Sequence, residues 1–118
     1  MEDKKISKTA VNDTTVIVKP FKTLDNNNAH EMVDIITAVQ EEGYKMIIVD
    51  MSDLEFLSSA GVGSILGTIE NSREAGGDII LCSVPDSINH ILEVLDLTDY
   101  LTIRESKDMA LNLAGTAN

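Results

Sequence analysis

Two adjacent serines, Ser58 and Ser59, stand at the junction between a predicted strand and a predicted helix. An apolar run over residues 46–49 indicates a buried strand, and apolar positions recur at helical spacing beyond Ala60. A serine at a helix start lies beside unsatisfied backbone N–H groups and the positive end of the helix dipole. A phosphate there would add about −1.5 to −2 charges to the surface. Alternatively, either serine is simply a helix N-cap, a role that contributes about 1 kcal/mol.

Two catalytic interpretations of the same stretch fit poorly. A nucleophilic serine needs a base within reach and commonly lies in a G-x-S-x-G turn, but residues 57–61 lack the leading glycine. The histidines, His30 and His90, have no obvious orienting carboxylate beside them. The glycines at 61, 63 and 67 miss the G-x-G-x-x-G spacing by one residue, and a long connection separates them from the strand. Hydrolysis and dinucleotide binding are therefore not expected.

The elements that must position the serines alternate along the chain. Residues 6–11 and 14–19 predict two strands joined by a hairpin turn, and a polar connection follows around residues 24–28. Further strands are expected over 46–50, 78–82 and 101–103, and helices over 29–42, 60–75, from 85–86 onward and from 106. A short polar connection separates the strand at 46–50 from the serines. This order predicts one α/β domain whose sheet is largely parallel in its later part.

Composition excludes several classes of function. The 118 residues suffice for one domain, and 9 basic against 20 acidic residues give a net charge of −11. So acidic a surface repels nucleic acid and anionic membranes and favours a protein partner with a basic docking face. No signal peptide and no membrane-spanning run are expected, so we expect a cytoplasmic protein. The single cysteine, Cys82, lies in an apolar run and is expected to be buried, and no metal site is expected.

The stretch Val49–Gly63 resembles the signature of STAS domains, and most closely that of bacterial anti-sigma factor antagonists. Their pattern is roughly D-L-S-x-(two or three)-F-(I/L/M)-D-S-(S/T)-G-(L/V)-G. The resemblance continues at Leu24–Asp25, at Ala75–Leu81 and over Ser106–Leu111, so it spans about residues 6–114. It implies that residues 1–118 form a single STAS-like domain with a fraying C-terminal tail. The implied fold is a small mixed, mostly parallel sheet with about four helices packed mainly on one side.

By resemblance, the function is partner switching, with no cofactor and no enzymatic activity of the chain itself. The unphosphorylated protein would bind an anti-sigma factor that is also a serine kinase of the histidine-kinase-like ATPase fold. Phosphorylation would release it, and a metal-dependent serine phosphatase would restore it. Alignment on Gly61 places the phosphoacceptor at Ser59 in preference to Ser58. The implied partner-binding residues are Asp25, Ser58, Ser59, Ala60, Gly61 and Ser64.

The sequence departs from the family pattern at three positions. Ser58 replaces an acidic residue, Ala60 replaces a second hydroxyl, and Lys22 replaces a glycine. The helix after the serines is expected to turn Ser64, Thr68 and Asn71 outward, towards the partner or solvent. The alternative function is a STAS scaffold or ligand-sensing module in a signalling assembly that serine phosphorylation does not control.

Overall fold

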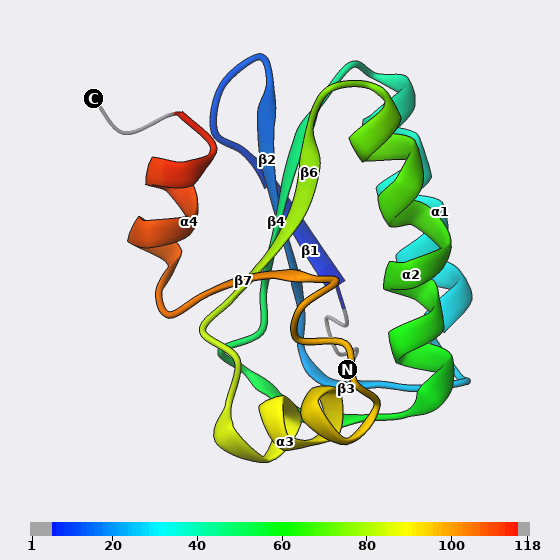
Figure 1. The fold of residues 1–118 in the computed structure, drawn as a ribbon. Coiled ribbons are helices and arrows are strands. Elements are labelled where there is room, and N and C mark those ends of the chain that lie inside the picture. The colour runs from blue at the N-terminus through cyan, green and yellow to red at the C-terminus, as the bar shows by residue number, and fades with distance from the viewer. Residues whose placement is uncertain (1–5, 116–118) are drawn as a thin grey trace.

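The computed structural model describes residues 6–115 as alternating strands and helices (Figure 1). The strands are β1 (Ile6–Ala10), β2 (Thr15–Pro20), β3 (Lys22–Leu24), β4 (Met46–Asp50), β5 (Leu54–Leu57), β6 (Asp78–Cys82) and β7 (Thr102–Arg104). The helices are α1 (Ala29–Glu41), α2 (Ser59–Glu74), α3 (Asp86–Val94) and α4 (Lys107–Leu113). Most of the tail expected to fray, residues 116–118, lies outside the described residues.

The main sheet has five strands in the order β1-β2-β4-β6-β7. β1 pairs with β2 antiparallel, and every later pair is parallel, so the expected mixed, mostly parallel sheet is confirmed. The hairpin between β1 and β2 is closed by Asn12, whose Oδ1 accepts the N–H groups of Thr14 at 2.8 Å and Thr15 at 2.9 Å. Such an Asx turn is the usual reason for asparagine at this position.

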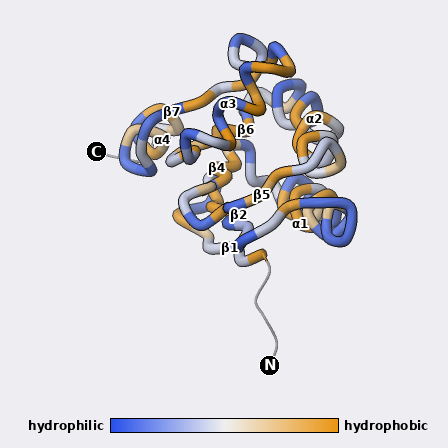
Figure 2. The backbone as a smooth tube through the Cα atoms, turned by 90° about the horizontal axis from the view of Figure 1, so that it is seen from below, coloured by the Kyte–Doolittle hydropathy of each residue, from blue (hydrophilic) through white to orange (hydrophobic). Residues whose placement is uncertain are grey.

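The helices lie on both faces and at one end of the sheet. α1 and α2 cover one face, α4 lies against the other, and α3 lies at the lower end (Figure 1). The larger core includes buried residues of the sheet and of α1 and α2. In the view from below, α1 and α2 lie together on one side of β2, β4 and β6 (Figure 2). A smaller cluster of Ile48, Ile80, Cys82 and Ala110 lies under α4. Cys82 is fully buried as expected, and this burial raises the pKa of its thiol to about 11. No helix in residues 6–115 is both long and apolar enough to cross a membrane.

Two short strands were missing from the sequence prediction. β3 and β5 form a separate two-stranded parallel sheet, in which Thr23 is opposite Phe56 and Leu24 is opposite Leu57. The polar connection expected before the serines contains β5, and no strand was expected at β3, because three- and four-residue strands do not show a clear alternation of apolar and polar residues. Leu54 and Leu57 are buried while the two residues between them are exposed. Tertiary pairing, rather than local pattern, makes these strands.

The face of α2 that carries small hydroxyl side chains packs against α1. Ser64 and Thr68 are each 3% exposed and Ser72 is 1% exposed, so the expectation that Ser64 and Thr68 point outward was wrong. Small hydroxyl side chains can be buried on a helix because they donate to carbonyls of their own preceding turn. The Thr68 hydroxyl lies 2.9 Å from the carbonyl oxygen of Ser64. Across the interface, the Gln40 side chain of α1 donates to the Thr68 carbonyl at 2.8 Å and to the Ser72 hydroxyl at 2.9 Å.

Replacing Gln40→Leu removes this donor from a buried hydroxyl. We expect the free energy of unfolding, measured by urea titration, to fall by about 1–3 kcal/mol. Ser72→Ala removes one of the same hydrogen bonds, so the double variant should lose less than the sum of the two single losses. Strict additivity would show that Gln40 and Ser72 do not stabilise the helix pair through this bond.

Candidate functional site

The turn that leads from β4 to β5 is held by charged side chains. Asp50, whose side chain is 7% exposed, accepts the N–H of Ser52 at 3.0 Å. The Lys19 ammonium lies 3.3 Å from a carboxylate oxygen of Asp53 and 3.9 Å from one of Asp50. These contacts fix the direction in which the chain enters β5, and therefore the start of α2.

Ser58 is the N-cap of α2. Its backbone is extended, with φ −96° and ψ 173°, and its Oγ accepts the N–H of Gly61 at 3.2 Å. Its own N–H donates to the carbonyl of Leu24 at 3.0 Å, which continues the β3–β5 ladder by one residue. The capping role that the sequence left open for either serine therefore belongs to Ser58.

Ser59 is the first helical residue of α2, and it is exposed. Within the described part of the chain its hydroxyl has no hydrogen-bond partner, whereas the Ser58 hydroxyl is engaged by the cap. The junction of β5 and α2 at Ser58 and Ser59 is called the serine corner below. Both α1 and α2 begin at the lower end of the molecule, near this corner (Figure 1). The Ser59 hydroxyl thus faces solvent beside the positive end of a 16-residue helix.

Gly61 lets the first turn of α2 touch β3. A Cβ atom at Gly61 would lie 2.4 Å from the carbonyl oxygen of Leu24 and 2.8 Å from a methyl carbon of Leu57. Gly61 is itself buried, so it supports the corner from inside rather than lining an exposed surface. Ser64 is buried as well, and its hydroxyl donates to the Gly61 carbonyl oxygen at 2.6 Å. It is therefore not on the exposed surface, where it was expected from the sequence to contact a partner. Ala60 is half-buried.

Asp25 lies beside the serines because Leu24 and Leu57 are opposite each other in the β3–β5 pair. It is half-buried, and its Oδ1 accepts the N–H of Asn27 at 2.9 Å. The corner at Ser58–Ser59 and the connection from β3 to α1 therefore form one continuous surface. The structure thus places Asp25 near Ser58 and Ser59, and their binding of a partner stays a prediction.

Two features of this surface were not found from the sequence. Lys22 has a φ of 70°, a left-handed conformation that costs a non-glycine residue about 1–2 kcal/mol. That conformation explains why the family pattern has glycine there. The second feature is a hollow of about 460 Å³ in front of β3 and α1, which Phe21, Asp25 and Glu31 help to line. No group of three or more His, Cys, Asp or Glu residues in the described chain is placed to hold a metal ion.

Alanine substitutions at two glycines of α2 should have opposite effects. Gly61→Ala places a methyl group against the backbone of β3, so we expect the free energy of unfolding to fall by about 1–3 kcal/mol. A Cβ at Gly63 meets nothing within 4 Å, so Gly63→Ala should stabilise the protein by about 0.5–1 kcal/mol through helix propensity. Urea unfolding of both variants measures the difference. Equal effects would mean that α2 does not contact β3 as closely as described.

The two serines should also differ in their contribution to stability. Ser58→Ala removes the N-cap acceptor, so we expect a loss of about 1 kcal/mol in thermal or urea unfolding. Ser59→Ala removes an exposed hydroxyl that has no hydrogen-bond partner within residues 6–115, and should change stability by less than about 0.5 kcal/mol. The reverse order of the two losses would assign the cap to Ser59 and contradict the geometry.

A protein-family comparison matches residues 7–110 to the STAS domain. Among proteins of known function, the chain is 23% identical over 101 residues to the anti-sigma-B factor antagonist of Staphylococcus aureus. That match covers 86% of this chain and 94% of the relative. The chain is thus similar along nearly its whole length to regulators that act on an anti-sigma factor.

Solved structures show the same arrangement. The anti-sigma factor antagonist SpoIIAA in its unphosphorylated form superposes with a TM-score of 0.80 at 22% identity, covering 96% of this chain and 99% of that one. The phosphorylated form of the Bacillus cell fate determinant SpoIIAA gives a TM-score of 0.72 at 22% identity, covering 92% and 97%. At these identities the likeness establishes the fold alone. Together with the family match it leads to one conclusion: the chain belongs to the STAS domain family.

Proposed function

We propose that this protein is an anti-sigma factor antagonist that acts by partner switching. In its unphosphorylated form it binds an anti-sigma factor that is also a serine kinase, and phosphorylation at Ser59 releases it. The similarity to the Staphylococcus aureus antagonist over 86% of the chain supports the regulatory class. SpoIIAA, which shares this fold, is known in unphosphorylated and phosphorylated forms.

The exposure of the Ser59 hydroxyl is the observation that carries the proposal. A kinase must bring this oxygen in line with the γ-phosphate of ATP, so the acceptor has to be reachable from solvent. Ser59 is exposed, and its hydroxyl lacks a partner within residues 6–115. Ser58 is half-buried and its oxygen caps the helix, so phosphorylation there would disturb the start of α2. Ser59 is therefore the serine that a kinase can phosphorylate without breaking a hydrogen bond of its side chain within residues 6–115.

The phosphate would act on the partner rather than on the fold. At the N-terminus of α2 a dianion is stabilised by the helix dipole and by free backbone N–H groups, so the helix tolerates it. A partner packed against this corner would have to accommodate new bulk and to remove water from a dianion, which is costly without matched donors. The acidic chain, at net charge −11, attracts a basic partner over longer distances. A metal-dependent serine phosphatase would restore the binding form.

A phosphorylation assay tests the proposal directly. The purified chain is incubated with ATP and, one at a time, with each anti-sigma factor of the histidine-kinase-like ATPase fold that its genome encodes. Mass spectrometry should find one phosphate on Ser59 in the wild type and in Ser58→Ala, and none in Ser59→Ala. In a binding assay, Ser59→Asp should weaken the complex by about tenfold or more, while Ser59→Ala should bind like the wild type.

Two results would contradict the proposal. One is the absence of phosphate on Ser59 with every such kinase. The other is a Ser59→Asp variant that binds as tightly as the wild type. A chain that forms a large homo-oligomer in sedimentation, indifferent to both substitutions, would instead support the scaffold function of STAS domains.

A further inference from the structure

Both phenylalanines of the chain are exposed. Phe21 is 48% exposed and Phe56 is 52% exposed, although aliphatic side chains fill the core completely. A ring that is half exposed buries only part of its apolar surface in the fold, whereas aromatic residues are enriched among those that dominate binding energy at protein interfaces. Their position therefore needs an explanation from binding.

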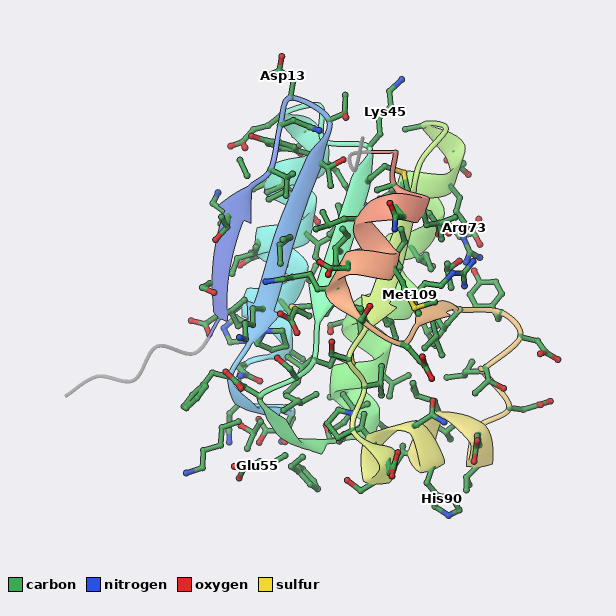
Figure 3. The ribbon with its side chains drawn as sticks, turned by 90° about the vertical axis from the view of Figure 1, so that its left-hand side faces the viewer. Asp13, Lys45, Glu55, Arg73, His90 and Met109 are labelled. Atoms are coloured by element: carbon green, nitrogen blue, oxygen red, sulfur yellow. The ribbon has the colours of Figure 1, made fainter. Side chains whose placement is uncertain are left out.

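One of the two rings lines a hollow, and the other is paired with a residue that lines it. Phe21 is part of its lining, together with Lys22, Thr23, Asp25, His30 and Glu31. Phe56 is opposite Thr23 in the β3–β5 pair, so its side chain stands next to that of Thr23 on the face turned away from the core. Phe21 thus lines a hollow of about 460 Å³, and Phe56 stands beside Thr23 at its edge. Glu55, the neighbour of Phe56 in β5, lies at the lower end of the molecule (Figure 3).

The hollow is rigid because its inner wall is held by hydrogen bonds. Asn28, which is 8% exposed, accepts the N–H of Asp25 at 2.9 Å with Oδ1. Its Nδ2 donates to the carbonyl of Thr23 at 3.0 Å. A site whose shape is fixed before binding loses less conformational entropy when a partner docks.

The charges around the hollow indicate what it would accept. Asp25 and Glu31 contribute two carboxylates to the lining and Lys22 contributes one ammonium, within a chain of net charge −11. A protruding aliphatic or aromatic side chain would find apolar contact at Phe21 and Phe56. A basic side chain beside it would find a carboxylate. This combination fits a basic protein segment better than a nucleic acid or an anionic lipid surface.

We propose that Phe21 and Phe56 anchor the partner. The hollow that Phe21 lines, with Phe56 at its edge, takes an apolar side chain of the anti-sigma factor that docks on the serine corner, and Asp25 or Glu31 pairs with a basic residue next to it. This inference rests on the proposed function, because it assigns the binding energy of the same complex to particular residues. The hollow adjoins Ser58 through the Leu24–Leu57 pair, so a partner that covers Ser59 reaches it without a second docking event.

The other exposed apolar side chains of the described residues lie outside the hollow. They are spread over the β1–β2 hairpin, α3 with the turn after it, and α4. None of them lines the hollow or is paired with a strand residue that does: Val11, Val94, Leu95, Tyr100, Met109 and Leu113. Isolated apolar residues on a surface are common and carry no functional information. They do provide matched controls, because truncating them also removes an exposed apolar side chain.

The test measures the dissociation constant of the full chain for the purified anti-sigma factor kinase that modifies it. We expect Phe21→Ala and Phe56→Ala each to raise this constant by about tenfold or more, while Val94→Ala and Leu113→Ala stay within about twofold of the wild type. Glu31→Gln should slow association more at low salt than at high salt. Thermal unfolding of each variant shows whether it is folded, as exposed positions lead us to expect.

The outcomes separate this inference from the proposed function. If Ser59→Asp weakens binding but both phenylalanine variants bind like the wild type, the anchor assignment is wrong and partner switching stands. If the wild type binds none of the kinases, both are overturned. If the chain alone forms a dimer that Phe21→Ala dissociates, the hollow belongs to a second copy, which also contradicts the assignment.

Discussion

The contact between the first turn of α2 and the end of β3 determines the geometry of the whole corner. The carbonyl of Leu24 accepts the N–H of Ser58 at 3.0 Å, and Gly61 lies so close to the same oxygen that a Cβ would come within 2.4 Å of it. A larger residue at position 61 would push the helix away from the strand. Because this contact fixes the rotation of α2, the next residue after the cap, Ser59, must face solvent.

This arrangement separates the structural task from the regulatory one. Ser58 caps α2, and Gly61 allows the helix to pack closely against β3, so both residues have structural roles. The Ser59 hydroxyl makes no hydrogen bond within residues 6–115, so we propose that its chemical state can change without a change of fold. On the other side of the corner, Asn28 holds the connection to α1 in one shape. In the proposed function, the surface that a partner would meet is consequently preformed, and a charge on Ser59 would switch it.

The sequence predicted the larger elements because their signals are local. Apolar runs predicted β4 and β6, and apolar residues at helical spacing predicted α2. In the structure Gly43 and Gly76, both at positive φ, lie just beyond the ends of α1 and α2. The strands β3 and β5 could not be predicted, because each is defined by pairing with the other across about thirty residues of chain. The face of α2 was misassigned for a related reason. Serine and threonine look polar in a sequence, yet Ser64 and Thr68 satisfy their hydroxyls within the helix and are buried against α1.

The central claim is that phosphate on Ser59 alters the surface and leaves the fold unchanged. The backbone amide chemical shifts of the isotope-labelled chain, recorded before and after phosphorylation of Ser59, test it most directly. The account predicts shifts confined to the start of α2 and to the neighbouring residues around Asp25, with the amides of β2, β4 and β6 unchanged. Shifts spread through those central strands would show that the phosphate acts by refolding the protein, and would contradict the account.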